Sequence, residues 1–289
     1  VLDYSIKLAK NGRPGPVWID VPIDIQGATY NNKKQKQIFK FKEEKIRLKD
    51  KKSIDLLVDK LSKAKRPAII AGGGIRASKS YDQFLEFVSN TSIPVLTAWG
   101  AHDLLEDSHK NYCGRPGTVG DRSGNFIIQN CDLLLILGSR LNIRQIGYNF
   151  NEFSPNSYKV MVDIDNGELN KKTLNIDLKI NTDLKDFFSA IKPNLKQINN
   201  LKHNSYLEWC KNLKESYPVF RKEFEKSQLI NPYNFVDKLF DILNEKDVVV
   251  TSDGTAVVTT FQGAKIKKNQ RLFSNSGSAS MGYGLPAAI

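Results

Sequence analysis

The chain has 289 residues, of which 40% are hydrophobic, so it is long and apolar enough to bury a sizeable core. Its length suggests roughly two domains of about 150 residues each. No run reaches the ~18 consecutive apolar residues that a membrane-spanning helix needs. The first residues, VLDYSIKLAK, have neither an initiator methionine nor a signal-peptide layout. We therefore expect a cytoplasmic protein without a membrane partner.

The formal net charge of +12 raises the question of a nucleic-acid partner, because clustered lysine and arginine neutralise phosphates. Lysine is, however, spread over the whole chain. The densest run, residues 31–52, is interrupted by Glu43, Glu44 and Asp50. This mixture of charges is typical of a solvated linker, so no nucleic-acid partner is expected.

Cysteine and histidine do not fall into a metal-binding pattern. The cysteines are odd in number and widely spaced, and the histidines form no HExxH or similar motif, so neither a disulfide framework nor a metal site within the chain is predicted. These residues are Cys113, Cys131 and Cys210, and His102, His109 and His203.

The first residues predict only part of a folded unit. Residues 2–9 have the pattern of an amphipathic helix, and the apolar run at residues 17–21 is expected to be a buried strand closed by Pro22. One strand cannot form a sheet by itself. The N-terminus is therefore expected to be a cut end, with residues 1–30 closing a preceding domain and residues 31–52 forming the linker.

Strands and helices alternate between residues 53 and 195. Ser53 is expected to cap a helix whose apolar positions from Ile54 to Leu61 follow helical spacing. Continuous apolar strands joined by helices are typical of a parallel sheet covered on both faces. We therefore predict an α/β, doubly wound, Rossmann-like central domain. Its strands are expected at residues 67–71, 94–97, 133–137, 159–162 and 178–181, and its main helices at residues 81–89, 121–129 and 183–191.

Residues 196–228 predict a helical linker with one apolar packing stripe. The stripe consists of Tyr206, Trp209, Leu213, Tyr217 and Phe220.

Residues 229–289 predict the start of a second α/β domain. Asn231 and Pro232 are a typical helix start, and apolar residues follow at helical spacing. They are Phe235, Leu239, Ile242 and Leu243. A strand at residues 248–251, a turn at Gly254, a helix, a strand at residues 271–273 and a last helix within residues 282–289 are expected to follow.

A glycine cluster follows the first strand of the central domain. Gly72, Gly73 and Gly74 open the sequence GGGIRA, a variant of the dinucleotide-binding fingerprint. The acidic residue that usually binds the ribose, ~20 residues later, is missing, because the next strand ends in Thr97-Ala98-Trp99. A tight turn between strand and helix remains an equal alternative.

Further residues at the ends of the predicted strands are also typical of a nucleotide site, because ligands bind at that edge of a parallel sheet. Each has an alternative role in a turn or a helix cap. They are Gly114, Gly117, Gly138, Ser139, Arg140, Asp163, Asp165 and Asp183.

The order of segments resembles the acetolactate synthase, pyruvate oxidase and glyoxylate carboligase family of thiamine-diphosphate enzymes. GRPGPVWIDVPIDIQ (residues 12–26) is similar to the end of the family's pyrimidine-binding domain. RPAIIAGGG, GRPGTVG, DLLLILGSRLNIR and VDIDNGELNK are similar to motifs of its middle domain. SNSGSASMGYGLPAAI, residues 274–289, is close to the family's SGGLGTMGFGLPAAI and is the most specific of these motifs.

The resemblance implies a thiamine diphosphate site in residues 229–289, the first part of a diphosphate-binding domain. Residues matching Gly254, Thr255 and Ala256 approach the cofactor. The residue matching Ala279 offers a backbone carbonyl to the aminopyrimidine. The residue matching Met281, next to Ser280, supports the bent cofactor.

The resemblance also gives the middle domain a candidate second cofactor. In acetolactate synthases the positions that match the middle-domain glycines, Thr97, Ser139, Arg140, Asp163 and Asp183 hold FAD. Other members keep the domain without FAD, so FAD remains an alternative here.

The function implied by the resemblance is decarboxylation of a 2-keto acid and carboligation, with acetolactate synthase, which serves branched-chain amino-acid biosynthesis, as the specific expectation. A related transferase or lyase with another acceptor, a plain decarboxylase, and a nucleotide-binding module without catalysis are the alternatives. The catalytic glutamate and the magnesium-binding GDG…N motif are expected outside the chain, the latter beyond Ile289. This internal piece is therefore expected to be inactive alone, and the whole enzyme to be a homodimer or homotetramer.

Overall fold

The computed structural model describes residues 1–29, 46–48, 51–199, 203–226, 228–275 and 277–289. The chain divides into two units, Val1–Arg47 and Leu48–Ile289. Most of the predicted linker, residues 31–52, lies outside the described residues.

The first unit contains helices α1 (Leu2–Lys10) and α2 (Ile23–Gln26). The prediction of a buried strand at residues 17–21 is wrong. These residues belong to no strand of the described structure, and the Trp18 side chain is 91% exposed. An apolar run is buried as a strand only when neighbouring strands pair with it, and the described residues of this unit provide none.

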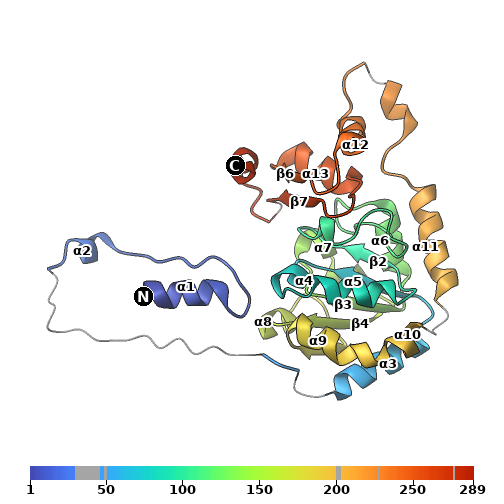
Figure 1. Cartoon of the computed structure of the whole chain (residues 1–289), viewed down its shortest axis with the longest axis horizontal. Coiled ribbons are helices and arrows are strands. Elements are labelled where there is room, and N and C mark those ends of the chain that lie inside the picture. The colour runs from blue at the N-terminus through green and yellow to red at the C-terminus, as the bar shows by residue number, and fades with distance from the viewer. Residues whose placement is uncertain (30–45, 49–50, 200–202, 227, 276) are drawn as a thin grey trace. The chain divides into compact units, whose positions relative to one another are not determined.

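The second unit is built on a five-stranded sheet in which every pair of strands is parallel. The order across the sheet is β2-β1-β3-β4-β5. Figure 1 shows part of this sheet, with β2, β3 and β4 labelled. The strands are β1 (Pro67–Ala71), β2 (Val95–Thr97), β3 (Leu133–Leu137), β4 (Tyr158–Asp163) and β5 (Leu178–Asn181). The predicted α/β fold with a parallel sheet is therefore confirmed.

Helices flank this sheet. The connection from β1 to β2 runs toward one edge and that from β2 to β3 runs back, so right-handed crossovers place their helices on opposite faces. On one side α5 (Tyr81–Ser89) packs on α9 (Leu184–Ile191), where the rings of Phe84 and Phe188 lie 6.3 Å apart. On the other side α6 (Arg122–Asn130) packs on α11 (Asn204–Ser216).

The remaining short elements connect these layers. They are α3 (Lys52–Lys63), α4 (Gly74–Ala77), η2 (His102–Leu104), α7 (Ile143–Ile146), η3 (Phe150–Glu152), α8 (Asn166–Leu169), η4 (Lys192–Asn194), α10 (Leu195–Asn199) and η5 (Lys222–Lys226).

Two expectations about these helices need correction. The N-cap of α3 is Lys51 and not Ser53, although the apolar positions from Ile54 to Leu61 are buried as predicted. Along α11, Tyr206 is buried, whereas Trp209 is 39% exposed at the rim of the contact. The stripe therefore packs along only part of its predicted width.

The core lies between the sheet and its helices. The side chains of β1, β2 and β3 are all buried, as continuous apolar strands covered on both faces should be. The three cysteines, Cys113, Cys131 and Cys210, are free and buried in the same core. In the described part of the chain, no helix is both long and apolar enough to cross a membrane.

We call the central sheet with its helices the central layer, and the smaller α/β region that follows from Pro232 onward the second layer. Strands β6 (Val248–Thr251) and β7 (Arg271–Ser274) pair in parallel beside α12 (Pro232–Ile242), α13 (Gly254–Gly263) and α14 (Gly284–Ala288). The side chain of Asn231 accepts a hydrogen bond from the Tyr233 N–H at 2.9 Å, which confirms the predicted start of α12.

The predicted apolar positions of α12 are confirmed only in part. Phe235 and Ile242 are exposed, whereas Leu243 packs beside Val236 and Phe240 in the cluster with Leu272. Two apolar stripes lie side by side along this helix. The helix packs one of them against the strands and leaves the other exposed.

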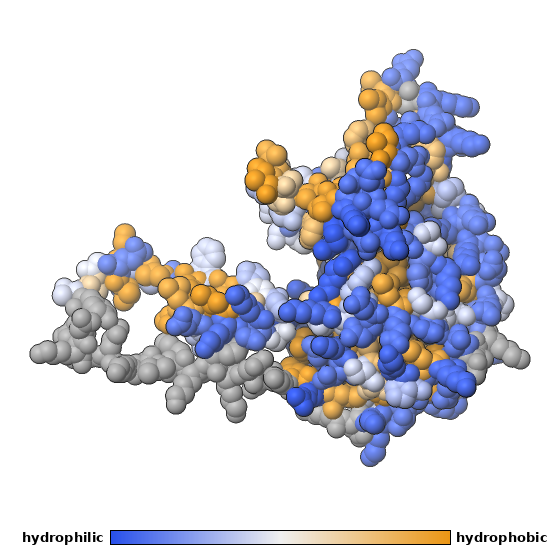
Figure 2. Space-filling model, viewed as in Figure 1, coloured by the Kyte–Doolittle hydropathy of each residue, from blue (hydrophilic) through white to orange (hydrophobic). Residues whose placement is uncertain are grey.

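This second layer presents large apolar side chains to solvent. Figure 2 shows hydrophobic atoms gathered over the segment that carries the C-terminus. Met281 is 87% exposed, Leu285 75% and Val248 61%.

Candidate functional site

The glycine cluster after β1 packs directly against the loop after β3. The N–H of Gly72 donates to the Leu137 carbonyl, and the N–H of Gly74 donates to the Gly138 carbonyl, each at 2.9 Å. A Cβ atom on Gly72 would lie 2.3 Å from the Gly138 oxygen, and one on Gly74 would lie 2.7 Å from the Gly138 Cα. These glycines are therefore required by contact between two loops of the protein itself.

Polar residues at the same edge of the sheet are engaged within the chain. The Asp163 carboxylate accepts a hydrogen bond from the Asp165 N–H at 2.9 Å. Asp183 caps α9 by accepting from the Lys185 N–H at 2.7 Å. Arg140 pairs with Glu168 at 2.8 Å. Thr97 and Ser139 are buried at the ends of β2 and β3.

The loop that contains Gly114 and Gly117 is fixed by Asp121. This carboxylate accepts a hydrogen bond from the Arg115 N–H at 2.7 Å and caps α6. Burial raises the pKa of the Asp121 carboxyl, although bonds from backbone N–H groups oppose that shift. A Cβ on Gly114 would lie 2.7 Å from the same carboxylate, and one on Gly117 would lie 2.8 Å from the Arg144 carbonyl.

Four of the glycines predicted for FAD do not offer space to a flavin nucleotide in this arrangement. A dinucleotide site needs glycines whose bare Cα faces the ligand. At Gly72, Gly74, Gly114 and Gly117 that space is already filled by the chain's own backbone or side chains.

The residues predicted for thiamine diphosphate lie in the two loops that follow β6 and β7. Because β6 and β7 run parallel with Thr251 beside Ser274, the loops that follow them leave the sheet at the same end. The first loop enters α13 at Gly254, and the second carries Ala279, Ser280 and Met281.

Gly254, Thr255 and Ala256 form the exposed first turn of α13. Gly254 has a φ of +65°, and no atom lies within 4 Å of the position of its missing Cβ. The first N–H groups of a helix lack partners within the helix and lie at its positive end, which suits a diphosphate.

The second loop has an unusual backbone and an exposed apolar side chain. Ala279 has a φ of 51°, a left-handed conformation that a residue with a Cβ rarely adopts. Gly284 holds the end of this loop against the first, since its Cβ would lie 3.2 Å from that of Ser252. An open helix start, a constrained carbonyl and the exposed Met281 side chain together fit the cofactor.

The contact between the two layers includes residues that the sequence reasoning did not identify. Trp99 stacks on Phe261 of α13 at 3.9 Å, and the buried His102 ring meets Phe261 edge-on at 4.7 Å. Arg115 reaches the end of α13, and Asp103 accepts a hydrogen bond from the Leu272 N–H at 3.2 Å. Only the aromatic type of Trp99 and Phe261 offered a signal in the sequence.

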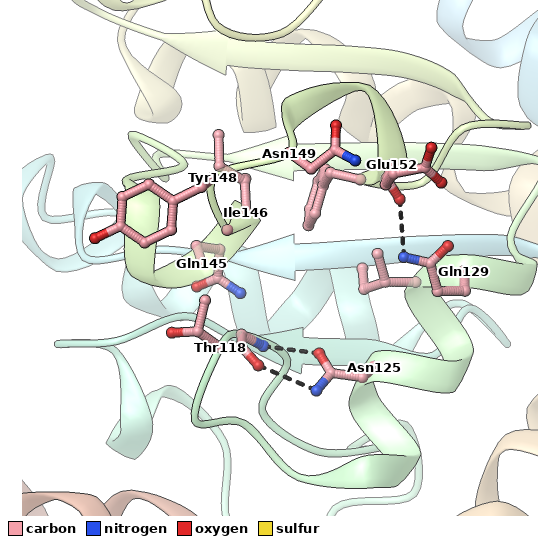
Figure 3. A pocket seen from close by; sticks show the side chains of 12 residues that line it. Thr118, Asn125, Gln129, Gln145, Ile146, Tyr148, Asn149 and Glu152 are labelled. Atoms are coloured by element: carbon pink, nitrogen blue, oxygen red, sulfur yellow. Dashed lines mark hydrogen bonds between the residues drawn. The ribbon is translucent and has the colours of Figure 1, made fainter.

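A pocket of about 310 Å³ lies between α6 and residues 143–153 (Figure 3). Its polar side chains mainly hold the surrounding loops. Asn125 exchanges two hydrogen bonds with the Gly117 backbone, Gln145 donates to the Pro116 carbonyl, and Gln129 donates to the Glu152 carbonyl. The pocket is therefore explained by loop packing.

Metal ligands do not cluster in the described part of the chain, where no group of three or more histidine, cysteine, aspartate or glutamate side chains is suited to hold an ion.

Comparison with known proteins identifies the middle of the chain. Residues 54–191 match the family model of the thiamine pyrophosphate enzyme, central domain. The whole chain is similar to the acetolactate synthase large subunit of Lactococcus lactis, with 32% identity over 292 residues and 49% of that protein covered. It is 28% identical over 296 residues to the acetolactate synthase isozyme 1 large subunit of Escherichia coli K12, covering 50% of it.

The large subunit of Cyanidium caldarium gives the same picture, with 29% identity over 299 residues and 50% coverage. The chain spans about half the length of the curated relatives that it matches. Residues 54–191 therefore belong to the thiamine pyrophosphate enzyme family as its central domain, within a chain that resembles acetolactate synthase large subunits along its whole length.

Proposed function

We propose that this chain is part of an enzyme that uses thiamine diphosphate to decarboxylate a 2-keto acid and join the product to a second carbonyl compound, as an acetolactate synthase does. The observation that carries the proposal is that the turn with Gly254 and the loop with Ala279 and Met281 follow two parallel, paired strands and so leave the second sheet at the same end. The resemblance to acetolactate synthase large subunits supports pyruvate as donor and, with it, a cytoplasmic biosynthetic role.

Bound thiamine diphosphate supplies the electron sink for this chemistry. The chain's own residues bind and orient it. The N–H groups at the start of α13, around Gly254, Thr255 and Ala256, would hold the diphosphate at the positive end of the helix. The Ala279 carbonyl would accept a hydrogen bond from the aminopyrimidine, Ser280 continues the loop, and the Met281 side chain would pack against the cofactor.

Calorimetric titration of the full protein with thiamine diphosphate and Mg²⁺ tests this assignment. We expect Met281→Ala to weaken binding at least tenfold, because the apolar support is lost. Leu285→Ala is the matched control, since Leu285 is also a large apolar residue, 75% exposed, in the same segment. Equal affinity of the two variants would contradict the assigned role of Met281, and no binding by the parent protein would end the proposal.

The isolated piece should be inactive. The residues proposed here bind and orient a cofactor, and no acid or base that would move a proton during the reaction is among them. We expect residues 1–289 alone to give no measurable turnover of a keto acid, measured as CO₂ release, under conditions in which the full enzyme is active. Turnover by the piece would show that its own side chains complete the site.

A related enzyme with another acceptor is the second candidate. Product analysis with pyruvate and a panel of aldehydes and keto acids distinguishes the two candidates. The exposed apolar residues of the second layer support a homo-oligomer, which sedimentation of the full protein would test.

A further inference from the structure

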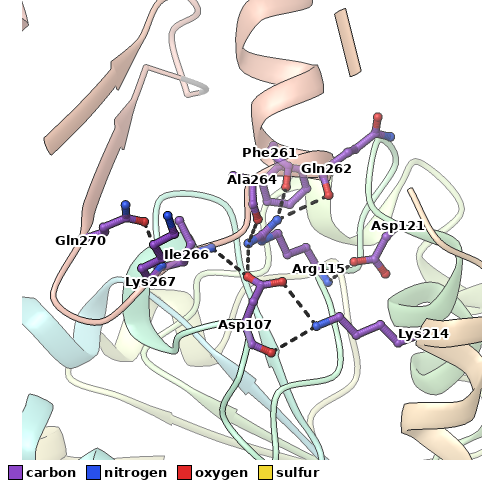
Figure 4. A network of polar contacts seen from close by, with 10 residues as sticks. All are labelled: Asp107, Arg115, Asp121, Lys214, Phe261, Gln262, Ala264, Ile266, Lys267 and Gln270. Atoms are coloured by element: carbon purple, nitrogen blue, oxygen red, sulfur yellow. Dashed lines mark hydrogen bonds and ion pairs between the residues drawn. The ribbon is translucent and has the colours of Figure 1, made fainter. Parts of the chain in front are cut away.

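The largest fully buried side chain of the described residues is that of Arg115, which is 2% exposed. Its guanidinium leaves the loop between Gly114 and Gly117 and reaches the last turn of α13 (Figure 4). Nη1 donates to the Phe261 carbonyl at 2.9 Å, and Nη2 donates to the Ala264 carbonyl at 2.8 Å.

These contacts stabilise both the end of the helix and the buried charge. The last carbonyls of a helix have no partners within the helix and form its negative end, so a fixed cation there is favourable. A buried guanidinium, in turn, is costly unless it is paired and hydrogen-bonded. Asp107 provides the pairing charge, at 3.2 Å from Nη2.

Asp107 extends the contact into a network. It accepts a hydrogen bond from the Ile266 N–H at 3.0 Å and pairs with Lys214 of α11 at 3.3 Å. Its own N–H donates to the Ile266 carbonyl at 2.9 Å. The residues that follow α13 are thus tied to the central layer by both backbone and side chains.

Phe261 is held from its side chain as well. Its ring is fully buried and stacks on Trp99 with an angle of 16° between the planes. Arg115 therefore binds the carbonyl of a residue whose ring is already fixed, which defines the position of the end of α13 in several directions.

We infer that Arg115 is a positioning residue of the cofactor site, acting through α13 on the turn formed by Gly254, Thr255 and Ala256. The inference rests on the proposed function. A helix of ten residues is about 15 Å long and stiff, so fixing its last turn fixes the direction of its first. Arg115 thereby connects the loop after β2, in the central layer, with the first turn of α13, in the second layer.

The test uses the full protein with Arg115→Met, Arg115→Lys and a matched control, Arg122→Met. Arg122 is exposed and its guanidinium lies over the Tyr217 ring at 4.8 Å, so the control removes an arginine that does not contact α13. Hydrogen exchange is followed in the peptide over α13 and in the peptide over β3.

We expect exchange in α13 to be at least tenfold faster in Arg115→Met, with β3 unchanged, and to be partly restored in Arg115→Lys. Lysine keeps the charge but lacks the planar fork that binds two carbonyls at once. The dissociation constant of thiamine diphosphate should rise at least tenfold in Arg115→Met and by less in Arg115→Lys. Arg122→Met should match the parent protein in both measurements.

Unchanged cofactor affinity in Arg115→Met would overturn the inference while leaving the proposed function intact. If the parent protein bound no thiamine diphosphate, the proposed function would fail first and the cofactor role of Arg115 with it. If Arg115→Met lost protection in β3 as well, the comparison of Arg115→Lys with Arg122→Met would decide. Identical exchange and affinity in that pair would refute the positioning role.

Discussion

Replacing Gly72 by alanine should destabilise the protein, whereas replacing its neighbour Gly73 should not. The new Cβ at position 72 would lie 2.3 Å from the Gly138 oxygen, about 0.7 Å inside the 3.0 Å that real Cβ contacts respect. The obstacle is backbone of the loop after β3, which cannot rotate away as a side chain could. Overpacking of this kind costs about 2–3 kcal/mol.

Replacing Gly73 by alanine should change the free energy of unfolding in the opposite direction. Its φ of −61° and ψ of −19° suit any residue, and the nearest atom to its missing Cβ is the Gly100 oxygen at 3.7 Å, an ordinary contact. Alanine there should stabilise by about 0.4–1 kcal/mol, because the unfolded chain loses conformational freedom. The two variants should thus differ by about 3 kcal/mol.

Urea unfolding, followed by far-ultraviolet circular dichroism, measures this difference as a shift of the midpoint at constant slope. Free energies of unfolding for Gly72→Ala and Gly73→Ala that agreed within about 0.5 kcal/mol would refute the steric reasoning. The result also bears on ligands. If the glycines instead served a bound phosphate, both variants would fold normally and both would lose that ligand.

Three further predictions follow from the same contacts. Ala279→Val should destabilise by about 1–2 kcal/mol in urea unfolding, because a β-branched residue resists the left-handed backbone, and Ala279→Gly should be tolerated; equal effects would argue against strain. Burial, aided by the Arg115 charge, holds the pKa of His102 well below its ordinary 6.5. The unfolded imidazole therefore takes a proton that the folded one does not, so stability should fall as the pH drops through that value. Between about pH 7 and about pH 5 the parent protein should therefore lose more stability than His102→Leu does, and parallel pH profiles would contradict this. Finally, the purified full protein should lack the flavin absorbance band near about 450 nm; a stoichiometric band would show that the loops around Gly72 open for FAD.

The central sheet could be predicted because its signal is local. The strands β1 and β3 are continuous apolar runs bounded by turns, and their alternation with helices indicates the parallel topology. The cap at Asp183 is local too, since its carboxylate bonds an N–H two residues along the chain.

The predictions that were wrong concern segments whose structure depends on residues far away in the sequence. Residues 17–21 have strand composition, but a strand exists only with neighbours. The turn of α12 that buries Val236 instead of Phe235 depends on where β7 lies.

No sequence feature near Arg115 indicates that its side chain binds the carbonyl of Phe261, which lies 146 residues later. The contact of Gly72 with Gly138 likewise looks, in the sequence, like a nucleotide fingerprint. Contacts that form only when distant segments meet therefore could not be derived from the sequence, and these include the contacts that fix the end of α13.

The buried cysteines have a practical consequence for the chemistry of this protein in air. Thiolate is the form that oxidises or reacts with alkylating reagents. Burial raises the pKa of the Cys131 thiol to about 11. A hydrogen bond with the Cys113 thiol, together with burial, raises the pKa of the Cys210 thiol. The folded chain should resist oxidants that attack exposed thiols. Because Cys113, Cys131 and Cys210 all lie in the core around the central sheet, the rate at which they become labelled should report how often that core opens.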